Sequence, residues 1–220
     1  MALLLAGGAL VVALDKVNSG PTRVLLIGDS LMAQAVPVTA NALNQAAFSV
    51  RAAPAPGTGL LDTKFNWLAK MQQLVDQYHP NIVIAEFLGN YGLFGDRPGI
   101  VTPAQFFSAW HAAAQQATDI LSSQGAHIFW VLGPPVSRPL DDQKVRTIAR
   151  LYKSLTSPPG HGTVSWIDEF PPFTDSEGHY IQSVQGPGGA PVPLRTPDGT
   201  HLSPVGAIRF SAAIVQAIIN

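Results

Sequence analysis

From Arg23 onward, short apolar stretches rich in β-branched residues alternate with longer stretches that have helical periodicity. The pattern predicts strands at residues 23–27, 48–51, 82–87, 127–132 and 163–167, and helices at 31–45, 64–78, 103–123, 141–155 and 204–219. Apolar strands separated by helices are typical of a parallel sheet that is buried on both faces. We therefore predict an α/β fold of three layers, an α/β/α sandwich around a five-stranded parallel sheet.

Residues with strong positional preferences mark the ends of several predicted helices. Thr102 and Gln105 have the spacing of a capping box, and Gly125 ends the same helix. Ser203 predicts the start of the last helix. Pro37 lies inside the first helix, and we expect it to kink or split that helix because proline lacks a backbone N–H.

A serine, a histidine and an aspartate, which can act together in catalysis, lie at two turns of the predicted fold. A Gly28-Asp29-Ser30 turn directly follows the first strand, and Asp198 and His201 lie three residues apart before the last helix. A serine hydroxyl becomes a good nucleophile when an imidazole takes its proton and a carboxylate orients that imidazole. Taken singly, these residues fit a helix cap and a turn, so the prediction depends on their joint occurrence.

Four sequence blocks resemble those of the SGNH, or GDSL, hydrolases and occur in the same order. Gly28-Asp29-Ser30-Leu31 resembles the first block, Gly59 the second, Gly89-Asn90 the third and Asp198-x-x-His201 the last. The resemblance spans nearly the whole chain from Arg23 onward. The third block departs from the common pattern Gly-x-Asn-Asp, because Tyr91 stands where the aspartate is often found.

The resemblance implies a flavodoxin-like strand order, 2-1-3-4-5, and a role for each block. It implies Ser30 as the nucleophile, His201 as its general base and Asp198 as the carboxylate that orients the imidazole. It implies an oxyanion hole made by the backbone N–H groups of Ser30 and Gly59 and the side-chain amide of Asn90. Ser30, Gly59 and Asn90 each follow a predicted strand, and the ligand crevice of such a sheet lies at the carboxyl ends of its strands.

Four further residues near these blocks are predicted to contact the substrate: Asp29, Leu31, Tyr91 and Arg195. Arg195 suits an anionic group or a sugar, and a structural salt bridge is the alternative. The approach Arg195-x-x-Asp198 also resembles a bacterial envelope branch of the superfamily that is associated with acylated polysaccharides.

The composition argues against several classes of function. With a net charge of −1 and 12% charged residues, the chain lacks a basic field for nucleic acid, and we expect no window of clustered Lys or Arg. It contains no cysteine, which excludes disulfides and thiolate chemistry. Its histidines lack the paired spacing typical of metal ligands, so we expect neither a metal nor another cofactor.

A length of 220 residues suits one domain, which we place at residues 23–220 after an apolar segment and linker at 1–22. The apolar run at residues 2–14 is shorter than the about 20 residues that span a bilayer, and it is typical of a signal-peptide core or an anchor remnant. Because no Lys or Arg precedes it, a helix packed on the domain is the alternative. We expect an exported protein of the cell envelope, periplasmic or secreted, with this segment as a candidate membrane tether.

Residues 168–202 are rich in proline and glycine and have no helical period. Long segments of this kind in compact domains are usually functional or disordered, and this one ends at Asp198 and His201. We therefore predict a lobe that borders the active site. For residues 186–193 alone, a low-complexity linker is the alternative.

Together these features favour a metal-independent serine esterase that removes an acetyl or other short acyl group from an envelope carbohydrate or lipid. An O-acyltransferase that passes the acyl group to a sugar hydroxyl is the alternative, because both reactions use the same acyl-enzyme. From another class, a non-catalytic module that binds acylated polysaccharide remains open.

Overall fold

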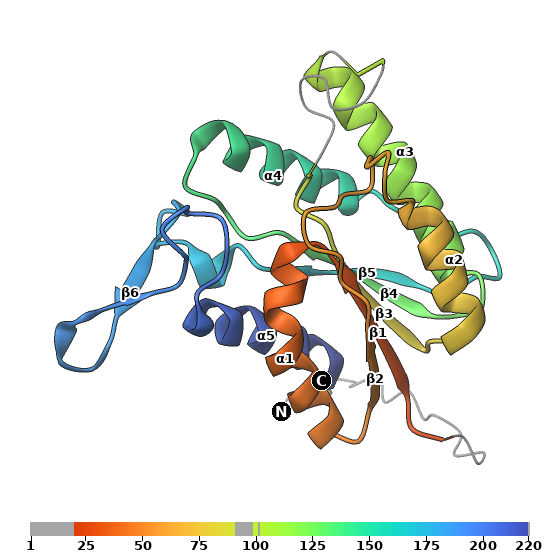
Figure 1. The fold of residues 1–220 in the computed structure, drawn as a ribbon, viewed down its shortest axis with the longest axis horizontal. Coiled ribbons are helices and arrows are strands. Elements are labelled where there is room, and N and C mark those ends of the chain that lie inside the picture. Colours follow the sequence, from red (N-terminus) through yellow and green to blue (C-terminus); the bar gives the residue numbers. More distant parts are fainter. Residues whose placement is uncertain (1–19, 91–98, 101, 220) are drawn as a thin grey trace, which may run out of the picture.

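A five-stranded parallel sheet forms the centre of the computed structural model, which describes residues 20–90, 99–100 and 102–219 (Figure 1). Its strands are β1 (Arg23–Gly28), β2 (Ser49–Ala52), β3 (Ile82–Glu86), β4 (His127–Leu132) and β5 (Val164–Asp168). They lie in the order β2-β1-β3-β4-β5. The predicted number and order of strands are confirmed.

Helices cover both faces of the sheet. They are α1 (Ser30–Gln45), α2 (Trp67–Tyr78), α3 (Pro103–Ser122), α4 (Pro139–Tyr152) and α5 (Pro204–Ile219). Helices α1 and α5 pack together on one face, and α2, α3 and α4 cover the other (Figure 1). The predicted three-layer α/β/α architecture is therefore confirmed.

The buried strand β1 shows why its sequence is apolar throughout. Leu25 and Ile27 belong to the core beneath α2, α3 and α4, whereas Val24 and Leu26 belong to the core beneath α1 and α5. All four side chains are fully buried. Because successive side chains of a strand point to opposite faces, a strand covered on both faces needs an apolar residue at every position.

The end of β1 approaches the end of β3 very closely. Gly28 pairs with Glu86, and a Cβ at position 28 would lie 2.3 Å from the Glu86 carbonyl oxygen. A glycine is therefore required at this point. Since the strands are parallel, β1 and β3 end at the same edge of the sheet, and the chain turns there into α1.

Helix α1 continues through Pro37, so the predicted split is wrong. Pro37 is exposed, while the opposite face of the helix buries residues that include Leu31, Ala35 and Leu43. The carbonyl that Pro37 leaves without a helical donor is that of Ala33, one turn earlier. Packing of the buried face against α5 holds the helix together despite this loss.

Some predicted helix ends also differ from the structure. Helix α2 begins at Trp67 rather than at residue 64, because Asp62 holds the preceding residues in a turn and Asn66 caps the helix. Helix α4 begins at Pro139 rather than at residue 141 and ends at Tyr152 rather than at residue 155, and proline is well suited to a first helical position. The predicted capping box at Thr102 is confirmed.

Residues 168–202 contain more regular structure than expected. The elements are the short 3₁₀ turns η1 (Pro171–Phe173) and η2 (Pro187–Gly189) and the strands β6 (Ser183–Gln185) and β7 (Pro191–Pro193). Strands β6 and β7 pair as an antiparallel hairpin that projects from the body of the molecule (Figure 1). A low-complexity linker at 186–193 is therefore wrong, because these residues form the hairpin turn and its second strand.

None of the helices in the described part of the chain is long and apolar enough to cross a membrane. Residues 1–19 lie outside the described residues. The apolar segment and linker predicted at 1–22, and the domain start at residue 23, therefore stay predictions.

Candidate active site

Ser30 lies at the point where β1 turns into α1, and its side chain meets a loop from the far end of the chain. Ser30 Oγ lies 3.0 Å from Nε2 of His201, and Nδ1 of the same ring lies 2.7 Å from Oδ2 of Asp198. The structure thus brings together the three side chains predicted as nucleophile, base and orienting carboxylate, although Ser30 and His201 are 171 positions apart.

The Asp198 carboxylate is held by donors from its own loop. Its Oδ1 accepts hydrogen bonds from the N–H groups of Thr200 at 2.8 Å and His201 at 3.0 Å, and from the Thr196 hydroxyl at 2.8 Å. Partial burial acts to raise the pKa of Asp198, but the hydrogen bonds from Thr200 and His201 outweigh it and hold this pKa well below its ordinary value. Asp198 is therefore ionised at neutral pH.

An ionised Asp198 sets the protonation pattern of the imidazole. A carboxylate only accepts hydrogen bonds, so the contact at 2.7 Å places the ring proton of His201 on Nδ1. Nε2 is then an acceptor for the Ser30 hydroxyl. The side chain of His201 is 41% exposed, so its ring can also reach a leaving group.

A buried arginine supports the loop that carries Asp198 and His201. Arg195 is 1% exposed and donates to the carbonyl oxygens of Thr200 and Pro135, each at 2.7 Å. Its guanidinium lies 4.5 Å from the centre of the Phe173 ring. The predicted substrate contact at Arg195 is therefore not supported, because Nη1 and Nη2 each donate to a carbonyl oxygen inside the protein and the side chain is buried.

Gln34 ties the same loop to the helix that begins with Ser30. Its side-chain amide donates to the Leu202 carbonyl oxygen at 3.2 Å and accepts from the Leu202 N–H at 3.0 Å. Gln34 lies four residues after Ser30, on the same side of α1. We did not predict this role, and the spacing from Ser30 was the only signal for it in the sequence.

The predicted oxyanion donors lie around the turn at Asp29. Asn90 Nδ2 donates to Asp29 Oδ2 at 3.1 Å and to the Thr58 carbonyl oxygen at 3.2 Å. A Cβ at Gly59 would lie 2.2 Å from the Asn90 carbonyl oxygen, so the two loops approach too closely for any other residue. Among the described residues, the backbone N–H groups of Ser30 and Gly59 have no acceptor.

Two buried carboxyl groups lie beneath the nucleophile. Asp29 and Glu86 have no exposed surface, and Glu86 Oε2 accepts from the Met32 N–H at 3.2 Å. Burial, and after it the charge of Asp29, raises the pKa of Glu86 well above its ordinary value, which favours the neutral form of Glu86. Asp29 also accepts from the N–H groups of Leu31 at 3.1 Å and Leu88 at 2.9 Å.

We did not predict the role of Glu86, although the sequence held a signal. It is the only charged residue in the otherwise apolar strand β3. A charge at a position buried on both faces is rare unless it has a partner.

The other predicted substrate contacts have different outcomes. Asp29 and Leu31 have no exposed surface, and Asp29 is occupied by the donors described above, so neither is placed to touch a substrate. Tyr91 lies outside the described residues. Among residues 20–90, 99–100 and 102–219, no group of three His, Asp or Glu side chains could hold a metal ion.

The fold and the arrangement of the four blocks resemble those of the SGNH hydrolases. The chain belongs to the family described as "Protein of unknown function (DUF459)", which matches residues 23–217. No curated protein sequence matches it.

Solved structures with the same fold include esterases and acetyltransferases. A carbohydrate acetylesterase from Sinorhizobium meliloti has 14% identity and a TM-score of 0.59, covering 89% of this chain and 97% of its own. The periplasmic domain of a lipopolysaccharide acetyltransferase from Salmonella ser. Paratyphi A has 14% identity and a TM-score of 0.56, covering 91% and 85%. The catalytic domain of a peptidoglycan O-acetyltransferase from Streptococcus pneumoniae has 15% identity and a TM-score of 0.53, covering 91% and 94%.

Proposed function

We propose that the protein is a serine esterase that cleaves acetyl or other short acyl esters of an envelope carbohydrate or lipid. The observation that carries the proposal is the continuous line of hydrogen bonds from Asp198 through His201 to Ser30. The two contacts support the proposal because they place the three groups in the order that nucleophilic attack requires.

In the proposed reaction, His201 Nε2 takes the proton of Ser30 as Oγ bonds to the ester carbonyl carbon. The tetrahedral intermediate collapses when His201 returns the proton to the leaving alcohol, which gives an acyl-enzyme. Water activated by His201 then attacks the acyl carbon, releases the acid and restores Ser30. Asp198 stabilises the imidazolium in both steps.

The oxyanion of each intermediate needs fixed donors. The N–H groups of Ser30 and Gly59 have no acceptor among the described residues and are available for this role. The Asn90 amide uses both hydrogens within the protein, toward Asp29 and Thr58. In our proposal Asn90 keeps its bond to Asp29 and exchanges the bond to the Thr58 carbonyl for the oxyanion.

A small hollow beside Asn90 favours a short acyl group. It has a volume of about 80 Å³, and its lining combines apolar side chains, Leu88, Val136 and Val145, with the charged side chains of Arg138, Asp141 and Lys144. A larger apolar hollow of about 430 Å³ lies along α1 and α5 and is lined by residues that include Leu202 and Ile208. Activity that falls steadily from acetate to octanoate esters supports the small hollow, and a preference for octanoate favours the larger one.

O-acyltransfer is the second candidate. The related folds include proteins described as a lipopolysaccharide acetyltransferase and a peptidoglycan O-acetyltransferase. The acyl-enzyme at Ser30 is common to both reactions, and the exposed His201 could activate a sugar hydroxyl in place of water. The first of these proteins is described as a periplasmic domain, which also supports our proposal of an exported location.

The deciding experiment measures covalent labelling and turnover together. The wild-type protein should react with a fluorophosphonate probe at Ser30 and hydrolyse p-nitrophenyl acetate, whereas Ser30→Ala should do neither. Ser123→Ala, which removes an exposed hydroxyl at the end of α3, is the control and should behave as wild type. No labelling in the wild type would leave a non-catalytic binding module as the better account.

Products identified by mass spectrometry distinguish hydrolysis from transfer. We expect free acetate with water as the acceptor. Acetylated oligosaccharide as the main product, formed faster than acetate, would favour the acyltransferase.

A further inference from the structure

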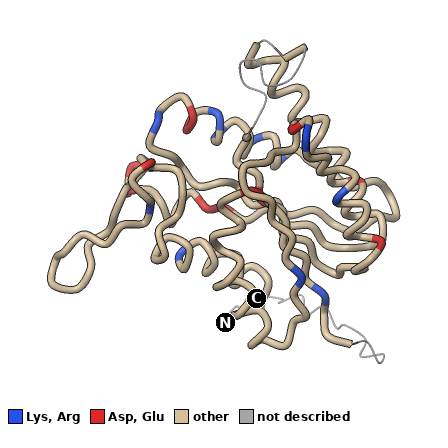
Figure 2. The backbone as a smooth tube through the Cα atoms, viewed as in Figure 1, with Lys and Arg blue, Asp and Glu red and all other residues tan. Residues whose placement is uncertain are grey.

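Positive charge is concentrated in and around helix α4. Five of the thirteen Lys and Arg residues of the chain lie between positions 138 and 153, together with only two acidic residues. Basic residues recur along this helix (Figure 2). We expected no such cluster from the sequence, because neighbouring basic residues are separated by apolar and polar ones and only the helix brings them together.

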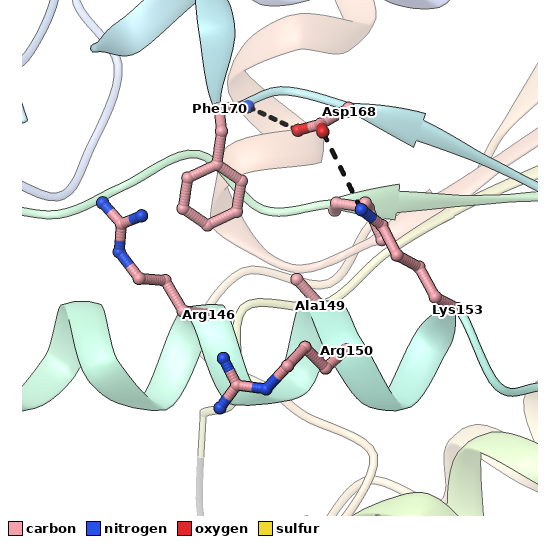
Figure 3. A pocket seen from close by; sticks show the side chains of 7 residues that line it. Arg146, Ala149, Arg150, Lys153, Asp168 and Phe170 are labelled. Atoms are coloured by element: carbon pink, nitrogen blue, oxygen red, sulfur yellow. Dashed lines mark hydrogen bonds and ion pairs between the residues drawn. The ribbon is translucent and has the colours of Figure 1, made fainter. Parts of the chain in front are cut away.

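Three of these cations border a hollow at the end of the sheet. Arg146, Arg150 and Lys153 follow the spacing i, i+4, i+7 and lie on one side of α4. In Figure 3, Arg146 lies beside Phe170 and Lys153 reaches Asp168, which come at and just after the end of β5, whereas the Arg150 guanidinium extends along α4. The hollow has a volume of about 230 Å³, and it combines cationic side chains with an aromatic ring.

The three cations differ in how firmly they are held. Arg146 forms an ion pair with Asp142 at 2.6 Å, donates to the Gly178 carbonyl oxygen at 3.0 Å and lies 4.9 Å from the centre of the Phe170 ring. It is therefore part of the framework of the hollow.

The other two cations are more available. Lys153 lies 4.0 Å from Asp168, at the limit of an ion pair. Arg150 donates to the Thr147 hydroxyl at 2.8 Å and has no carboxylate partner among the described residues. Arg150 and Lys153 can turn toward an anion in the hollow at little cost, because both are near the solvent.

The hollow lies on the same edge of the sheet as Ser30. Leu132 and Asp168 are the last residues of β4 and β5, and Ser30 follows the end of β1. Two strands separate β1 from β5, so at a spacing of about 4.8 Å the hollow is about 14 Å from the strand that carries the nucleophile. A chain of several sugar units bound at Ser30 can reach it.

We propose that this hollow is a subsite for a carboxylate of an anionic polysaccharide whose acyl ester lies at Ser30. The inference rests on the proposed function and adds the charge of the substrate to it. A concave site with an aromatic wall suits a sugar that carries a carboxylate. A flat membrane surface or a nucleic acid would call for a broader basic field, and the net charge of −1 does not provide one.

The test compares acetyl esters on charged and neutral polymers. The variant Arg150→Gln/Lys153→Gln should lower kcat/KM on O-acetylated polygalacturonate about 5-fold, since each exposed charge contributes modestly and is screened by salt. Its activity on O-acetylated glucomannan, a neutral polymer, and on p-nitrophenyl acetate should stay at the wild-type level. Asp168→Asn removes a negative charge from the hollow and should raise kcat/KM on the charged polymer about 2-fold.

The control is Arg51→Gln/Lys70→Gln, which makes the same change in net charge on β2 and α2. It should leave the preference for the charged polymer unchanged. Equal losses in the two double variants, equal effects on charged and neutral polymers, or no effect at all would overturn the subsite.

A binding measurement separates failure of the subsite from failure of the proposed function. Ser30→Ala should bind de-esterified polygalacturonate in a calorimeter, and adding Arg150→Gln/Lys153→Gln should weaken this binding about 5-fold. If no variant hydrolyses any ester but this difference in binding is found, the subsite stands without the esterase. Binding to phosphatidylglycerol vesicles that needs Arg150 and Lys153, with none to polygalacturonate, would assign the hollow to lipid headgroups instead and overturn the proposal.

Discussion

The two halves of the candidate active site are held in opposite ways. Beneath Ser30, the carboxyl groups of Asp29 and Glu86 have no exposed surface and are bound by backbone donors from α1 and the end of β3. On the other side, His201 and Asp198 have side chains that are 41% and 52% exposed, on a loop held by hydrogen bonds within it and by Arg195. The inner half belongs to the core, and the outer half belongs to the surface.

This difference matches the separate demands of acyl transfer. A nucleophile and its oxyanion donors must keep fixed positions around a carbonyl group, which buried neighbours held by backbone hydrogen bonds provide. The base must reach both a leaving alcohol and an incoming water, which requires exposure. Substitutions in the inner half should therefore affect folding and the proposed chemistry together, whereas those at the exposed His201 and Asp198 should affect the proposed chemistry first.

The largest effect is expected where the two halves meet. Ser30→Ala should lower kcat by up to about 10⁶-fold, because the nucleophile is lost, while the melting temperature stays near that of wild type. His201→Ala should act similarly, and Asp198→Ala should cost about 10⁴-fold because the imidazole loses only its orienting partner. Steady-state kinetics on p-nitrophenyl acetate provides the test. If Ser30→Ala, free of wild-type enzyme, retained a tenth of the activity, the nucleophile would be another residue.

Asn90→Ala examines the inner half at its border with the substrate. If Asn90 donates to the oxyanion, kcat should fall about 10² to 10³-fold with little change in KM. Loss of its bonds to Asp29 and Thr58 should also lower the free energy of unfolding by about 1 kcal/mol. Kinetics and melting temperature measured on one preparation separate the two effects, and a destabilised variant with normal turnover would limit Asn90 to a structural role.

Arg195→Met examines the anchor of the outer half. The change leaves the carbonyl oxygens of Thr200 and Pro135 without their donor, which should cost about 2 to 4 kcal/mol of unfolding free energy and lower kcat through a displaced His201. Arg209→Met is the control, because Arg209 also donates to a carbonyl oxygen, that of Pro172, which lies outside the loop that carries Asp198 and His201. If Arg195→Met does not fold, Arg195→Lys replaces it in the same measurements. Equal effects on kcat at positions 195 and 209 would argue against Arg195 as a specific anchor of the loop that carries Asp198 and His201.

Glu86→Gln examines the buried carboxyl pair through the pH dependence of stability. Burial and the charge of Asp29 raise the pKa of Glu86 well above its ordinary 4.5, so above pH 4.5 the folded protein holds a proton that the unfolded chain releases. Wild-type stability should therefore fall, relative to the variant, as pH rises from 4.5 toward the raised pKa, by up to about 1.4 kcal/mol per pH unit. Denaturant unfolding at several pH values measures the free energy of unfolding, and Glu177→Gln, at an exposed position, is the control. If the free energy of unfolding of wild type and Glu86→Gln changed with pH in parallel, Glu86 would not be protonated in the folded state.

The parts of the fold that depend on local pattern were predictable from the sequence. The apolar residues of β1, the turn at Asp29 and the capping box at Thr102 are all decided by residues close to each other in the chain. The strand order came from the resemblance to a known family, because periodicity alone does not specify which strands are neighbours. Helix starts were less certain because side chains such as Asp62 compete for the same backbone groups.

The parts of the site that depend on tertiary contacts were not predictable. Nothing near Arg195 in the sequence indicates that its side chain is buried against Phe173 rather than facing the cleft. The hydrogen bonds of Glu86 and Gln34 join residues between 54 and 168 positions apart. The three residues of the Ser-His-Asp arrangement were found because their chemistry restricts residue type and order, whereas residues that only position them are free to differ.

The link between Gln34 and Leu202 has a consequence for the rotational setting of α1. Both hydrogen bonds require the amide at position 34 to face the loop, and the neighbouring Ala33 and Ala35 have no group that could replace it. A turn of α1 about its own axis by one residue, about 100°, would break both bonds and point the first residue of the helix away from the imidazole. One side chain near the start of the helix thus helps to set the direction of the serine hydroxyl, without any contact with it.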